Sequence, residues 1–145
     1  MKRWFVVFIL TLSLLCGCQG EEAHLDEQPM TQAEIEQFAG IHFPPGVRDV
    51  LAHSEAGIDR LLLLRFTLDA ETLEGFMRDS HFAGQLEEGY RPFPTTYGAG
   101  LSWWNAQNAQ HFSGIQDRWG GVVRQMMVDS TTPGIVIVYL VVFET

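Results

Sequence analysis

The stretch Ile135-Val136-Ile137-Val138-Tyr139-Leu140-Val141-Val142-Phe143 is apolar at every position. A short, continuous apolar run of this kind is typical of a buried β-strand. Because neither face of the strand offers polar side chains to water, we expect it in the middle of a sheet or between two layers. The run is too short for a membrane-spanning helix, which needs about 20 residues.

Two β-hairpins are predicted, and one of them, over residues 121–143, contains this strand. Residues 121–128 form its partner, and the intervening turn is rich in Asp, Ser, Thr, Pro and Gly. The other hairpin covers residues 47–68 and joins a shorter strand to a longer one. Alternate residues of the longer strand are apolar and are expected to face the core: Leu62, Leu64, Phe66 and Leu68. Phe66 and Ile137 are expected to share that core.

Two helices are predicted from their capping residues. Thr31 and Glu34 fit a capping box, and Gly40 stands where a helix C-terminus often takes glycine, so a short helix is expected between them. The main helix is expected over residues 70–80, with Asp69 as its N-cap and an apolar stripe that packs on the sheet.

The predicted fold class is therefore α+β, as a single domain over residues 31–145. Its antiparallel sheet contains the two β-hairpins, and one main helix packs on one face. Residues 83–121 resist assignment, because Gly, Pro and aromatic residues dominate them. A structureless stretch of this length is uncommon in a compact domain, so it is either functional or hides a strand.

The N-terminal residues carry an export signal. Lys2 and Arg3 precede an uncharged apolar run at residues 4–15, which is typical of a secretory signal peptide. The run ends in Leu15-Cys16-Gly17-Cys18, which resembles the lipobox of bacterial lipoproteins. In that motif a leucine stands three positions before the lipidated cysteine, and a small residue stands directly before it. The resemblance covers residues 1–18.

This resemblance implies that signal peptidase II removes a signal peptide at residues 1–17. Cys18 then carries a diacylglycerol thioether, usually with a further acyl chain such as palmitate on its amine. Each buried methylene contributes about 0.8 kcal/mol, so such a lipid anchors the protein to a membrane. Residues 18–30 are interpreted as a lipidated acidic tether. Gln19 replaces the Asp that signals inner-membrane retention, which favours the cell envelope at the periplasmic side of the outer membrane in a Gram-negative organism.

The charge and the cysteine count restrict the partners and the stabilising bonds. The whole chain has a formal net charge of −9, which becomes −11 once Lys2 and Arg3 leave with the signal. A polyanion without a basic cluster is not expected to bind nucleic acid. Cys16 leaves with the signal and lipid blocks Cys18, so the mature domain has no disulfide and depends on its core.

No pattern of catalytic, cofactor-binding or metal-binding residues stands out. The five histidines lack metal-ligand spacing, and the chain contains neither a Gly-x-Ser-x-Gly elbow nor a phosphate-binding glycine loop. We therefore predict no catalytic residue, no cofactor and no metal.

Aromatic residues form the one candidate binding surface, which comprises Tyr90, Tyr97, Trp103 and Trp104. The simpler interpretation is that this stretch folds back as a lid over the sheet, because a small domain without disulfides needs its aromatic residues in the core. If the chain is extended there, the adjacent tryptophans point to opposite sides, so one anchors the stretch and the other faces outward.

The leading hypothesis is a membrane-anchored lipoprotein of the cell envelope that acts as a non-enzymatic binding or structural module. Its partner would be an envelope protein or glycan. The alternatives are a hydrolase of peptide or sugar bonds in the envelope, and a protective or immunity-type lipoprotein that blocks a toxin or lytic enzyme. Convergent titratable groups in a pocket would favour an enzyme over a binder.

Overall fold

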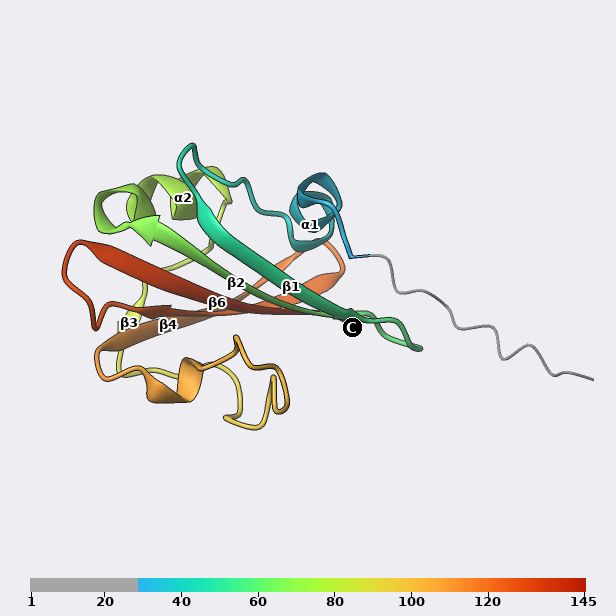
Figure 1. Cartoon of the computed structure of the whole chain (residues 1–145). Helices are drawn as coiled ribbons and strands as arrows, with labels where there is room; N and C mark the ends of the chain where they lie inside the picture. Colours follow the sequence, from blue (N-terminus) through green and yellow to red (C-terminus); the bar gives the residue numbers. More distant parts are fainter. Residues whose placement is uncertain (1–28) are drawn as a thin grey trace, which may run out of the picture.

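The computed structural model describes residues 29–145, in which six antiparallel strands form one sheet in the order β1-β2-β6-β5-β4-β3 (Figure 1). The strands are β1 (Arg48–Glu55), β2 (Leu61–Asp69), β3 (Glu87–Glu88), β4 (Phe112–Trp119), β5 (Val122–Asp129) and β6 (Ile135–Glu144). The predicted signal peptide, the lipidation site at Cys18 and the tether up to residue 28 lie outside the described residues.

Strand β6 lies in the middle of the sheet, as its apolar sequence predicts. It pairs with β2 on one side and with β5 on the other. Its residues alternate between two hydrophobic clusters on opposite faces of the sheet: Val136, Val138, Leu140 and Val142 in one, and Ile137, Tyr139, Val141 and Phe143 in the other. The strand is apolar on both faces because two layers cover the sheet.

Two short helices cover the first face of the sheet (Figure 1). They are α1 (Gln32–Ala39) and α2 (Leu73–Asp79), and a 3-10 turn, η1 (Ala70–Thr72), precedes α2. Ile35 of α1 and Phe76 of α2 belong to the same buried cluster as the expected core residues of β2: Leu62, Leu64, Phe66 and Leu68. The α+β class therefore holds in outline, but the structure is mostly sheet and its helices are short.

Ile137 lies on the second face of the sheet, so the prediction that it shares a core with Phe66 is wrong. The register pairs Phe66 with Val138 and Thr67 with Ile137. Successive residues of a strand point to opposite faces, so a shift of one residue moves Ile137 into the second cluster.

Helix α1 has the predicted capping box. The Glu34 carboxylate accepts a hydrogen bond of 2.7 Å from the backbone N–H of Thr31, and the Thr31 hydroxyl accepts one from the N–H of Glu34. The backbone N–H and the hydroxyl of Thr31 both donate to the Glu34 carboxylate, and these two bonds hold the pKa of Glu34 below its usual range. Gly40 ends the helix in the left-handed conformation, with φ of 60°.

Asp69 occupies the predicted N-cap position before η1, but its side chain makes no capping hydrogen bond. Its carboxylate instead accepts a hydrogen bond of 2.9 Å from Arg48 of the neighbouring strand. That bond and the charge of Arg48 hold the pKa of Asp69 below its usual range. The residue therefore links β1 to β2 and does not cap the helix.

Residues 83–121 hide β3, β4 and a 3-10 turn, η2 (Ala106–Asn108). The two-residue connection Gly120-Gly121 joins β4 to β5, in a hairpin that the sequence analysis missed. A Gly-Gly pair between two extended runs is itself a hairpin signal, so this strand could have been found. The expected hairpins β1–β2 and β5–β6 both form, and Ile58 lies fully exposed in the loop between β1 and β2.

Candidate functional site

The aromatic segment, residues 90–104, lies across the second face of the sheet, on the side opposite the helices (Figure 1, yellow to orange). Phe93, Trp104 and the following Ala106 are buried in the cluster that contains Tyr139 of β6 and Met127 of β5. Much of the segment is therefore a second hydrophobic layer, as the simpler interpretation of the sequence expected.

Trp104 is the centre of this layer and is only 5% exposed. Its ring centroid lies 5.3 Å from that of Tyr139 and 5.6 Å from that of Phe93. The backbone of Gly98 crosses close to the indole, so that a Cβ at Gly98 would lie 2.2 Å from Cγ of Trp104. Trp104 is thus held from several sides and anchors the segment.

Trp103 is half-buried and packs edge-on against Trp104, with ring centroids 5.8 Å apart. The chain here is not a strand, so the two rings do not point to opposite sides as an extended chain would require. Tyr97 is also half-buried, and Tyr90 is 37% exposed. The structure therefore leaves three of the four predicted residues accessible at least in part.

A pocket of about 500 Å³ opens within the aromatic segment and brings together Tyr97 and Trp104. Leu101, Thr95 and Gln107 also line it, whereas Tyr90 and Trp103 do not. Its wall contains no carboxylate, imidazole or guanidinium group. The hydroxyl groups and the amide suit neutral hydrogen bonding beside an apolar surface.

A polar group that the sequence analysis did not single out lies in the same face, beside the aromatic segment. The hydroxyl of Tyr139 donates a hydrogen bond of 2.5 Å to Oδ1 of Asn105. Burial raises the pKa of Tyr139, and the nearby Arg65 partly offsets that rise. The Cζ atom of Arg65 lies 6.0 Å from the centroid of the Tyr139 ring. Arg65 comes from β2, Tyr139 from β6 and Asn105 from the position directly after the aromatic segment, so only the fold brings them together.

A second polar group, also missed from sequence, is buried on the first face. Arg124 of β5 is fully buried and forms an ion pair with Asp117 of β4. Its remaining N–H groups donate to the backbone oxygens of Gly40, Ser80 and His81. These oxygens lie just after the two helices, so Arg124 fastens both helix C-termini to the sheet. We assign it a structural role.

Within residues 29–145, no group of three or more His, Cys, Asp or Glu side chains is arranged to hold a metal ion. In that part of the chain no helix is both long and apolar enough to cross a membrane. Comparison with protein-family models, with curated proteins and with solved structures gave no match. The function must therefore be argued from the residues themselves.

Proposed function

We propose that this chain is a lipid-anchored lipoprotein of the bacterial cell envelope that binds another envelope component, a protein or a glycan, without catalysing a reaction. The observation that carries the proposal is Leu15-Cys16-Gly17-Cys18, directly after a charged start and an apolar run. Diacylglycerol on Cys18 would hold the domain at the membrane, since two acyl chains suffice for stable anchoring.

The pocket of the aromatic segment supports the binding part of the proposal. Tyr97 offers a partly accessible ring, while Thr95 and Gln107 offer neutral hydrogen-bonding groups. Aromatic rings with a few well-placed polar groups are typical of sites that capture sugars or peptides. The absence of charged groups from this lining favours capture over hydrolysis.

Lipidation of Cys18 tests the anchor. The Cys18→Ala variant should lose palmitate labelling and either leave the membrane fraction or accumulate as the uncleaved precursor. Cys16→Ala is the matched control, because Cys16 would leave with the signal, and it should be labelled normally. Labelling that survives Cys18→Ala but not Cys16→Ala would place the lipid on the wrong cysteine and overturn the anchor.

Capture from detergent-solubilised envelopes tests the pocket. Tyr97→Ala should reduce the amount of envelope component retained by the immobilised protein. Tyr90→Ala removes an equally large ring from the same segment but outside the pocket, so it should leave retention unchanged. Equal retention by both variants and the wild type would exclude this pocket as the binding surface.

A further inference from the structure

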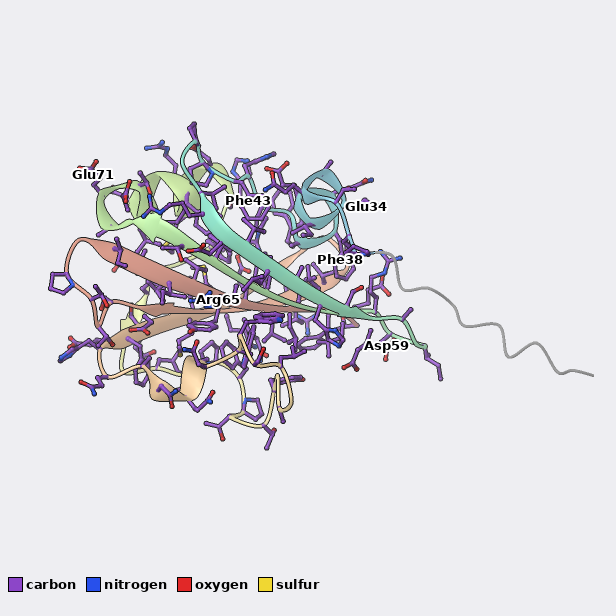
Figure 2. All side chains as sticks on the ribbon, in the orientation of Figure 1. Glu34, Phe38, Phe43, Asp59, Arg65 and Glu71 are labelled. Atoms are coloured by element: carbon purple, nitrogen blue, oxygen red, sulfur yellow. The ribbon has the colours of Figure 1, made fainter. Side chains whose placement is uncertain are left out.

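Arg65 is a half-buried arginine without an acidic partner in the described part of the chain. Three other arginines pair with carboxylates: Arg48 with Asp69, Arg78 with Asp79, and Arg124 with Asp117. Arg65 makes no such pair, and its Nε atom is buried without a hydrogen-bond partner. Figure 2 labels it near the middle of the sheet.

A partly buried guanidinium group is unfavourable unless an acceptor or an opposite charge pairs with it. A cation removed in part from water loses hydration that a paired charge normally replaces, and a buried N–H without an acceptor carries a further cost. Tyr139 offers Arg65 a cation–π contact at 6.0 Å and a hydrogen bond that lowers the pKa of the phenol, but neither contact supplies a negative charge. A negatively charged ligand group at the partly exposed side chain of Arg65 would offset part of this cost.

Asn105 provides a second donor at the same place. Its Oδ1 accepts the hydroxyl hydrogen of Tyr139, and its amide nitrogen makes no hydrogen bond within residues 29–145. Asn105 itself is exposed and Arg65 is half-exposed, so a ligand can reach both from solvent. Two side chains that can donate hydrogen bonds, one of them charged, thus both contact Tyr139.

We propose that Arg65 and Asn105 form a binding site for a single carboxylate group of a ligand. A guanidinium group matches a carboxylate with two parallel hydrogen bonds, and one positive charge balances one negative charge. A phosphate dianion carries two negative charges, so it would need a second cation beside Arg65. Arg91, another arginine on this face, already donates to the Ala106 carbonyl and contacts Met127.

This inference deepens the proposed function and rests on it for the source of the ligand. Envelope components offer carboxylates of two kinds, at the C-terminus of a peptide or on a sugar acid. Because the chain has a net negative charge, its overall field does not attract anions. Recognition must come from the local geometry of Arg65 and Asn105.

The experiment is an NMR titration of the purified full-length protein in detergent, observing the Arg65 Nε–Hε and Asn105 side-chain amide signals. The probes are N-acetyl-Ala-Ala and its C-terminal amide, glucuronate and glucose, and inorganic phosphate. We expect saturable shifts of both signals with the carboxylates and none with their neutral counterparts. Tighter binding of N-acetyl-Ala-Ala would indicate the C-terminus of a peptide as the ligand, and tighter binding of glucuronate would indicate a sugar acid. Tighter binding of phosphate, or no saturable shift with either carboxylate, would overturn the proposal.

Three variants separate the site from charge and folding effects. Arg65→Gln should weaken carboxylate binding roughly tenfold to a hundredfold. Asn105→Asp keeps an acceptor for Tyr139 but pairs internally with Arg65, so it should abolish binding without lowering the melting temperature. Arg118→Gln removes an exposed charge from the same face and should leave binding unchanged. Equal weakening by Arg118→Gln, or unchanged binding by Asn105→Asp, would contradict the proposed site.

This titration does not depend on lipidation of Cys18. Carboxylate binding by a chain that proves not to be lipidated would leave the Arg65 site standing and overturn only the anchor. A lipidated chain without carboxylate binding would do the reverse.

Discussion

Arg124 and Asp117 lie directly opposite each other on β5 and β4, and their side chains form a two-pronged ion pair on the helix-covered face. Nε of Arg124 donates to Oδ1 of Asp117 at 2.8 Å and Nη2 donates to Oδ2 at 2.5 Å. The Asp117 carboxylate also accepts from the backbone N–H of Ala83. With the three backbone oxygens that Arg124 binds after the helices, every N–H of its guanidinium group has an acceptor.

Replacing Arg124 with methionine should destabilise the fold by roughly 3–5 kcal/mol, because Asp117 is left as an unpaired buried charge. Chemical denaturation measures the loss. Arg78→Met is the matched control, since Arg78 pairs with Asp79 in solvent, where such a pair contributes about 0–1 kcal/mol. An equal loss of unfolding free energy in the two variants would show that the buried ion pair contributes no more than the exposed one.

Substituting Gly40 by alanine should cost more than substituting Gly46. Both glycines have a positive φ, so each alanine carries a strain of about 1–2 kcal/mol. A Cβ at Gly40 would also lie 2.1 Å from the Trp119 ring, whereas one at Gly46 would meet nothing within 4 Å. In a double-mutant cycle, Trp119→Ala should remove the extra cost of Gly40→Ala but not its backbone strain. Strict additivity of the two changes would contradict the clash.

The capping box of α1 should make stability depend on pH through Glu34. Its pKa is lowered in the folded chain from an ordinary value of 4.5, so the ionised carboxylate favours the native state. This contribution is complete above about pH 4.5 and disappears as the pH falls through the lower folded pKa. Thermal unfolding of the wild type and Glu34→Gln should therefore differ by a constant amount at neutral pH and converge in acid. A difference that stays constant down to pH 3 would contradict this role.

The two adjacent tryptophans should differ in their effect on stability. Trp104→Ala removes the buried centre of the second layer and should cost about 3–5 kcal/mol. Trp103→Ala removes a half-buried ring that contacts Trp104 from outside and should cost clearly less. Denaturant unfolding of the two variants checks this order, and the reverse order would mean that Trp103 is the anchor.

Local patterns of sequence predicted the parts of the fold that depend on neighbours in the chain. The apolar run of β6, the capping box at Thr31 and the two hairpins were readable because each signal spans a few residues. Strand β4 escaped because Gly114, Gln116 and Arg118 on one of its faces weaken the apolar alternation. The second layer was expected as a lid over the sheet, but the position of each ring was not predictable because the rings lie in a stretch without regular structure.

The candidate sites depended on contacts that sequence does not show. Tyr97 and Trp104 were identified as aromatic candidates, but only the fold shows that Tyr97 is partly accessible and that Trp104 is buried. Arg65 meets Tyr139 from a strand 74 positions earlier, and Arg124 reaches Gly40 over 84 positions. A single charged residue in an apolar strand is ordinarily expected to point outward, so the contacts of Arg65 and Arg124 were not predictable.

The position of β6 also determines when the sheet can assemble. It is the last of the six strands along the chain, yet it joins the β1–β2 hairpin to the β4–β5 hairpin. Pairing of β2 with β6 closes a long loop, which slows folding compared with a hairpin. Until residues 135–144 are available, β2 and β5 each lack the strand that pairs with their open edge. An exported chain built in this way would cross a membrane without its sheet and complete its fold only on the far side, after translocation of its final strand.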